Sequence, residues 1–195
     1  MLTNRIAIVL LAGLLAGPAF AQNTALDTFN DGADNAKVHK SGFVCPLHLG
    51  QFERDAVGQS DIDSGADFCS YAALDGVYGT IRLIPLTGAY DPKASMAQDF
   101  TEQEQTGSHK ISEGDLKLGG STVYARTYET SKLEDLHYRV TFAGAGLNGW
   151  AVEVTTEFAD PRDTPEQKDF LDAVYEAATK EIAAAPALAA TPTPR

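Results

Sequence analysis

The chain lacks most of the motifs that reveal a biochemical function directly. It contains no Gly-x-Ser-x-Gly string and no glycine-rich loop of the phosphate-binding or dinucleotide-binding type. Its four histidines form no metal-ligating pair on one predicted element. These absences argue against the motif-bearing serine hydrolases, nucleotide-binding proteins and dinucleotide-dependent oxidoreductases. The sequence implies no cofactor, and it favours a protein that is not an enzyme.

Basic residues are also scarce. There are 15 of them against 27 acidic residues, which gives a formal net charge of −12 at pH 7. No cluster of lysine or arginine offsets this charge locally. A chain of this kind repels phosphate backbones, so we expect no nucleic-acid partner.

Long apolar runs are absent except at the start of the chain. Arg5 precedes an apolar block over residues 6–15, and Ala19 and Ala21 form a small-x-small cleavage site. The block is shorter than the about 20 residues that a membrane span needs. Residues 1–21 are therefore predicted to be a cleaved signal peptide. The remaining chain is expected to be periplasmic or secreted, without stable membrane insertion.

Only two cysteines are present, Cys45 and Cys69. They are too far apart for the Cys-x-x-Cys spacing of redox-active dithiols, and no cationic group flanks Cys69. An even number of cysteines in an exported chain favours a disulfide. We predict one structural disulfide between them.

Composition divides the rest of the chain into three parts. Residues 22–40 are polar and irregular, which predicts a flexible N-terminal arm. Residues 184–195 are rich in alanine and proline, which predicts a disordered tail. Residues 41–183 are expected to form a single domain.

Alternating apolar and polar residues mark the strands of this domain. The clearest segments cover 121–129, 136–142 and 150–158, and weaker ones cover 50–55, 66–74 and 77–86. Asp75-Gly76 and Asn148-Gly149 have the composition of tight hairpin turns. Gly144 and Gly146 are assigned to the turn region before residue 150.

Two helices carry clear start signals. One begins at Asp91-Pro92, places Met96 and Phe100 on one stripe and ends at Gly107. The other begins at Thr164-Pro165 with Gln167 in the capping-box position. Its apolar stripe consists of Phe170, Leu171, Val174, Ala178 and Ile182. The predicted fold class is α+β, an antiparallel sheet of about five to six strands with two main helices packed on it and one disulfide.

The order of these elements over residues 50–183 resembles the exported PsbP/Mog1-like class. The segments that carry the resemblance are 79–83, the Asp91-Pro92 helix start, 123–129, 149–154 and the Thr164-Pro165 helix start. The resemblance implies an antiparallel sheet with packed helices and a binding or accessory role. It transfers no site residue, because none of these segments is a diagnostic motif.

An acidic string is the one candidate for a metal site. Asp61, Asp63 and Asp67 alternate along a loop, as ligands for calcium do. Gly65 and Ala72, however, stand where a calcium loop needs ligands. A plain acidic turn is the favoured interpretation, and a calcium-binding module remains an alternative.

A second candidate lies on the predicted strands. If the face opposite the apolar residues is exposed, it forms a ligand surface; if a helix covers it, its tyrosines are core residues. The candidate residues are Tyr124, Arg126, Tyr128, His137, Arg139 and Glu153. The favoured function is a non-enzymatic exported domain that binds an envelope protein or another extracytoplasmic component. The alternative is an envelope hydrolase with a polar site on this surface.

Overall fold

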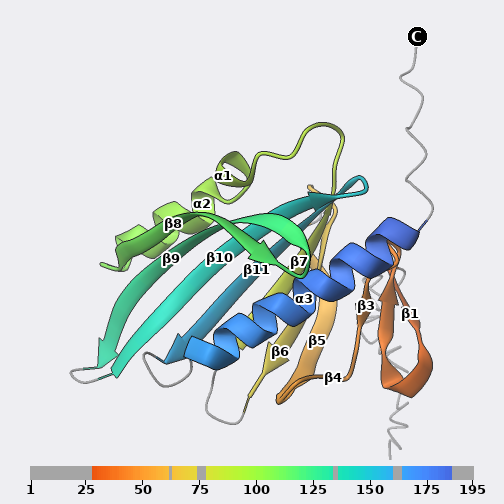
Figure 1. Ribbon diagram of the computed structural model, residues 1–195, viewed down its shortest axis with the longest axis horizontal. Helices are drawn as coiled ribbons and strands as arrows, with labels where there is room; N and C mark the ends of the chain where they lie inside the picture. Colours follow the sequence, from red (N-terminus) through yellow and green to blue (C-terminus); the bar gives the residue numbers. More distant parts are fainter. Residues whose placement is uncertain (1–27, 62, 74–77, 134–135, 160–163, 186–195) are drawn as a thin grey trace, which may run out of the picture.

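The computed structural model describes residues 28–61, 63–73, 78–133, 136–159 and 164–185. An antiparallel sheet of eight strands runs through it in the order β4-β5-β6-β7-β11-β10-β9-β8 (Figure 1). The strands are β4 (His48–Leu49), β5 (Phe52–Asp61), β6 (Ala66–Ala72), β7 (Tyr78–Pro85), β8 (His109–Leu118), β9 (Ser121–Leu133), β10 (Leu136–Leu147) and β11 (Trp150–Ala159). The helices are α1 (Pro92–Ser95), α2 (Ala97–Gln105) and α3 (Thr164–Ala184).

The three strongest strand predictions are confirmed. β10 pairs with β9 on one side and with β11 on the other. The predicted turn at Asn148 and Gly149 joins β10 to β11, and both residues have positive φ (44° and 84°), as tight hairpin turns require. The Asn148 amide also donates to the carbonyl oxygens of Ile182 and Ala185 (2.9 and 3.2 Å), so this turn caps the end of α3. The predicted Asp75-Gly76 turn lies outside the described residues.

The predicted α+β fold class is wrong, because the described chain is mostly sheet. It has eight strands in one sheet and three in a second, with only three α-helices and one short 3₁₀ turn. The ten-residue strand β8 was not predicted. It lies at the edge of the sheet and is exposed from His109 to Lys117, so it carries no alternation of apolar and polar residues.

The second sheet comes from a segment expected to be a flexible arm. It consists of β1 (Phe29–Asp31), β2 (Lys37–His39) and β3 (Val44–Cys45). The polar residues that suggested irregular chain form its first turn, where Asp34 and Asn35 adopt positive φ. The predicted disulfide is confirmed: Cys45 on β3 is bonded to Cys69 on β6, with a Cα–Cα distance of 6.4 Å. It links the two sheets.

Helix α3 lies across one face of the large sheet (Figure 1). Its predicted apolar stripe is buried against the strands. Phe170 packs edge-on against Phe52 and Tyr71, with ring centroids 5.1 and 5.9 Å apart. Gln167 is buried, and its side-chain amide donates to the hydroxyls of Thr141 and Thr156 (3.1 and 2.9 Å).

Helices α1 and α2 cover part of the opposite face, over β9 and β10. The predicted start is confirmed, since the Asp91 side chain accepts from the backbone N–H groups of Lys93 and Ala94. The helix is interrupted at Met96, which packs with Phe100 on Phe142 and the tyrosines of β9. This smaller core is separated from the α3 core by the sheet itself.

Candidate functional site

The predicted ligand surface divides into three separate parts in the structure. The first is the Arg126 cluster, made of Tyr124, Arg126 and Tyr128 on β9 with Glu104 and Glu113. Arg126 lies over the ring of Phe100, 3.9 Å from its centroid, and donates to both tyrosine hydroxyls at 3.2 Å. The tyrosines in turn donate to Glu113 and Glu104 (2.9 and 2.8 Å).

Helix α2 covers this cluster, so the two tyrosines are core residues rather than an exposed aromatic surface. Tyr124 and Tyr128 are 7% and 0% exposed. The Lys110 and Lys93 ammonium groups that contact Glu113, together with the Tyr124 hydroxyl, hold the pKa of this carboxyl far below its usual range. The cluster is therefore an ion-paired support for α2, and two of its members, Glu113 and Tyr124, also line a pocket of about 480 Å³.

The second part consists of His137 and Arg139, which do not join the other residues. Arg139 pairs with Phe158 on β11, whereas Glu153 pairs with Gly144. Because side chains alternate along a strand, Arg139 and Glu153 lie on opposite faces of the sheet. His137 contacts Glu129 at 3.6 Å. The predicted grouping of His137, Arg139 and Glu153 is therefore not formed.

The three aspartates of the acidic string also diverge. Asp61 accepts from the backbone N–H groups of Asp63 and Ser64 (3.0 and 3.2 Å) and so closes its own turn. Asp67 is buried on the α3 face and contacts His39 and Lys40 (3.0 and 2.9 Å). Across the described ranges, no group of three or more histidine, cysteine or acidic side chains is placed to hold a metal ion. The structure thus gives no support to the calcium alternative.

The third part is Glu153, which lies at the floor of a polar pocket. Its side chain is 1% exposed and accepts hydrogen bonds from three side chains. Arg82 donates at 2.8 Å, Tyr90 at 3.0 Å and Ser95 at 2.5 Å. Arg82 also forms a two-pronged ion pair with Asp99 on α2. A carboxylate buried in this way is stable only because its charge and its lone pairs are matched.

Two glycines of β10 position one of these donors. A Cβ atom on Gly144 would lie 2.2 Å from the Tyr90 hydroxyl, and one on Gly146 would lie 3.0 Å from Tyr90 Cβ. Tyr90 therefore packs directly on the strand and points its hydroxyl at Glu153. The prediction that these glycines belong to a turn is wrong, because β10 continues to Leu147. Burial, followed by the charge of Glu153, raises the pKa of Tyr90, so its phenol stays protonated and donates.

The pocket above Glu153 has a volume of about 470 Å³. We call it the Glu153 pocket. One wall is the end of the β5–β6 hairpin, and the other is α1 and α2. It is lined by Ser60, Asp61, Ser64, Ala66, Arg82, Ile84, Ser95, Gln98, Asp99, Glu102 and Glu153. Four carboxylates thus face one guanidinium, and the pKa of Arg82, which burial alone would lower, is raised by Asp99 and Glu153.

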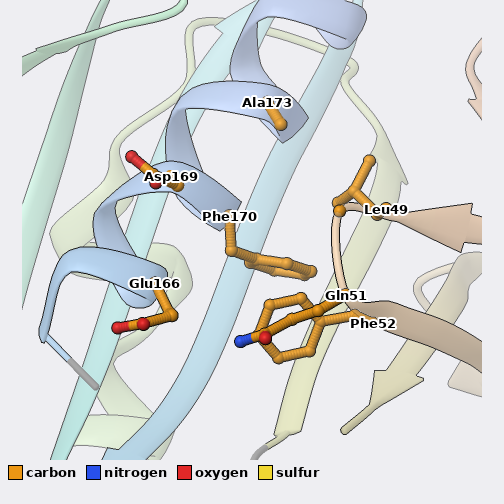
Figure 2. A pocket seen from close by; sticks show the side chains of 8 residues that line it. Leu49, Gln51, Phe52, Glu166, Asp169, Phe170 and Ala173 are labelled. Atoms are coloured by element: carbon orange, nitrogen blue, oxygen red, sulfur yellow. The ribbon is translucent and has the colours of Figure 1, made fainter. Parts of the chain in front are cut away.

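A second, apolar pocket of about 290 Å³ lies between the first turns of α3 and the β4–β5 hairpin. Figure 2 shows Phe170 facing Phe52, with Leu49 on the β-hairpin side and Glu166 and Asp169 on the helix side. Phe52 and Phe170 are already paired with each other and are 3% and 2% exposed. The pocket therefore offers a shallow apolar surface and no convergent set of polar groups.

No protein-family model matches the chain, and no curated protein matches it. The resemblance to the PsbP/Mog1-like class stays a prediction. The fold and the site together define a mostly β domain of two sheets, joined by a disulfide, with a charged pocket on one face. No helix among the described residues is long and apolar enough to cross a bilayer.

Sequence reasoning identified Glu153 but none of its partners. Arg82, Tyr90, Ser95 and Asp99 belong to segments that are distant from it in sequence. One available signal was that Gly144 and Gly146 continue the alternation of the predicted strand 136–142, because glycines at alternate positions of a strand indicate close contact with another segment.

Proposed function

We propose that the protein is an exported, non-enzymatic binding domain of the cell envelope, and that the Glu153 pocket binds an ammonium or guanidinium group. The N-terminal sequence supports export, and the disulfide fits an oxidising compartment. The observation that carries the binding role is the buried Glu153 carboxylate at the floor of an open pocket.

A purely structural role explains this arrangement poorly. Removing charges from water costs several kcal/mol per ion, and apolar side chains of similar size often stabilise a fold at least as well. Arg82, Asp99 and Glu153 nevertheless lie together beneath a pocket whose rim is polar. Buried charges that are retained at a pocket are typical of a binding site.

The charged side chains that line the pocket favour a positively charged ligand over a negatively charged one. Arg82 donates to both Asp99 and Glu153, so its positive charge is already neutralised by two carboxylates. Asp61 and Glu102 line the pocket as exposed carboxylates with no basic partner in it. The serine hydroxyls and Gln98 add acceptors for the N–H groups of a ligand. An anionic ligand would be repelled by this surface and by the net charge of −12.

Titration of the mature protein with agmatine and putrescine tests this proposal, with binding followed by calorimetry and by amide shifts in NMR spectra. A short arginine-containing peptide distinguishes a protein side chain from a small molecule as the source of the cation. We expect saturable binding that weakens as salt is raised. Succinate and glycerol should not bind.

Two substitutions and one control sharpen the test. Glu153→Gln should weaken binding about tenfold, because it removes the buried negative charge beneath the pocket and leaves the Arg82 charge matched by Asp99 alone. Glu102→Gln, on the exposed wall, should weaken it about two- to fivefold. Asp63→Asn removes an exposed charge next to Asp61 but outside the pocket, and it should leave the affinity unchanged. Equal affinities for all four proteins, or no saturable binding of any cation, would rule the site out.

A further inference from the structure

The two sheets are held together by side chains rather than by a shared hydrogen-bond ladder. The strand order places β1, β2 and β3 in one sheet of the described chain and the other eight strands in another. Besides the disulfide, the connections include Glu181 on α3, which accepts from the Val44 N–H at 2.8 Å, and Arg54, which donates to the Cys45 carbonyl at 2.6 Å. The most deeply buried polar connection is between His39 on β2 and Asp67 on β6.

His39 is enclosed on every side. The side chains of His39 and Asp67 are both 0% exposed. The rings of Phe29 on β1 and Trp150 on β11 lie 5.0 Å from the imidazole. The charged groups at the site are Asp67, 3.0 Å from Nε2, and Lys40, whose ammonium lies 2.9 Å from the same Asp67 oxygen. Water cannot stabilise a charge on the ring in this position.

The hydrogen bonds around His39 fit a neutral imidazole. Nδ1 accepts from the backbone N–H of Ser41 at 3.1 Å, so Nε2 carries the proton and donates to Asp67. Nδ1 also lies 2.8 Å from the Ser41 hydroxyl, which could accept from a protonated Nδ1, but protonation there would still leave the Ser41 backbone N–H without its acceptor. Lys40 already neutralises Asp67, so a second positive charge gains little from that carboxylate.

The contact is also incompletely satisfied. Oδ1 of Asp67 is buried and has no hydrogen-bond partner. An unmatched buried carboxylate oxygen reduces the net stability of the contact. Burial lowers the pKa of His39, an effect that outweighs the opposing influence of Asp67. The neutral ring is therefore favoured in the folded protein, and its contribution to stability is present above pH 6.5 and is lost as pH falls below this value.

We propose that the contact between His39 and Asp67 is an acid-sensitive latch that releases β1 and β2 from the large sheet when His39 is protonated. The disulfide between Cys45 and Cys69 keeps β3 fixed to β6, so the opening is confined to β1 and β2. Opening exposes Phe29 and the edge of Trp150, which are apolar surfaces covered at neutral pH. The proposal is independent of any ligand in the Glu153 pocket.

Hydrogen exchange measured by mass spectrometry tests the latch on the intact, oxidised protein between pH 7.5 and 5. After correction for intrinsic exchange, the protection of residues 29–45 should fall by up to about tenfold per pH unit below 6.5, as one linked proton requires. The protection of β10 and β11 should change far less. A uniform loss across all strands, or none in residues 29–45, would overturn the proposal.

Two further measurements guard against a variant that misfolds. His39→Gln should remove the pH dependence in residues 29–45, whereas His48→Gln, which removes an exposed histidine on β4, should retain it. In the unmodified protein, NMR of the imidazole nitrogens should show the Nε2–H tautomer of His39 at pH 7. A His39 that titrates at or above 6.5 would contradict the latch, because its protonation would then not oppose folding.

Discussion

The two faces of the eight-stranded sheet are covered in different ways. The α3 face is covered by a helix of 21 residues and encloses one continuous apolar core that includes Phe170, Val174 and Ile182. The α1–α2 face is covered by helices of four and nine residues over a small core around Phe100. It buries charges near its centre, in the Arg126 cluster and beneath the Glu153 pocket.

The two faces therefore have different roles: one stabilises the fold, and the other carries the pocket. Apolar burial is roughly additive and non-directional, so a long helix on an apolar face provides most of the stability. Buried ion pairs add little net stability but fix geometry. The α3 face therefore holds the domain together, and the α1–α2 face presents the pocket. On the α3 face, the carboxylate of Asp67 is buried and contacts His39 and Lys40.

The largest expected effect compares how much each of the two apolar cores contributes to the free energy of unfolding. Phe170→Ala should lower the free energy of unfolding by about 3–5 kcal/mol, since it leaves a cavity between Phe52 and Tyr71. Phe100→Ala should cost less, about 2–3 kcal/mol, because the short helix above it can settle into the space. Chemical denaturation of both variants measures the difference. A greater loss in the Phe100 variant would reverse the comparison.

A smaller effect concerns the α1–α2 face alone. Gly144→Ala forces a methyl group against the Tyr90 hydroxyl and should cost about 1–3 kcal/mol while it displaces the donor to Glu153. Gly146→Ala makes a milder contact with Tyr90 and should cost less. Thermal unfolding ranks the two, and binding of agmatine reports on the pocket. If both variants match the parent in stability and binding, Tyr90 does not depend on these glycines.

The smallest expected effect is at the start of α1. Asp91→Ala removes the acceptor for two backbone N–H groups and should cost about 1 kcal/mol. Asp91→Asn retains an acceptor oxygen and should recover most of that loss. The midpoint of urea unfolding measures both changes. A loss in the asparagine variant as large as in the alanine variant would show that charge, rather than capping, is responsible.

The sequence predicted local structure better than it predicted the fold class. Strands β9, β10 and β11, the turn at Asn148 and the starts of α1 and α3 have strong local signals, and they are confirmed. β8 was missed because an exposed edge strand has no apolar pattern to detect. The sheet of β1, β2 and β3 was missed because a turn with two left-handed residues looks like irregular chain. These omissions, rather than errors within helices, led to the α+β prediction.

In the candidate site too, residues with a local sequence signal were predicted, and contacts that depend on tertiary structure were not. Glu153 was predicted because it lies on the polar face of the alternating strand 150–158, and its position relative to Arg139 was wrong because pairing register is a tertiary property. Arg82, Tyr90 and Asp99 come to Glu153 through three different elements. Likewise, Asp67 appeared to belong to an acidic turn, but strand alternation turns it to the opposite face, toward His39.

The most direct test of the division between the two faces is the unfolding midpoint of a variant in which the pocket charges are made apolar. The variant combines Arg82→Met, Asp99→Leu and Glu153→Leu, with Tyr90→Phe to remove a hydroxyl that would lose its acceptor. Calorimetry should find a midpoint equal to or above that of the parent protein, since a buried ion cluster stabilises less than apolar packing of similar volume. A fall of about 10 °C, which corresponds to several kcal/mol, would show that these charges hold the fold together and would contradict the account.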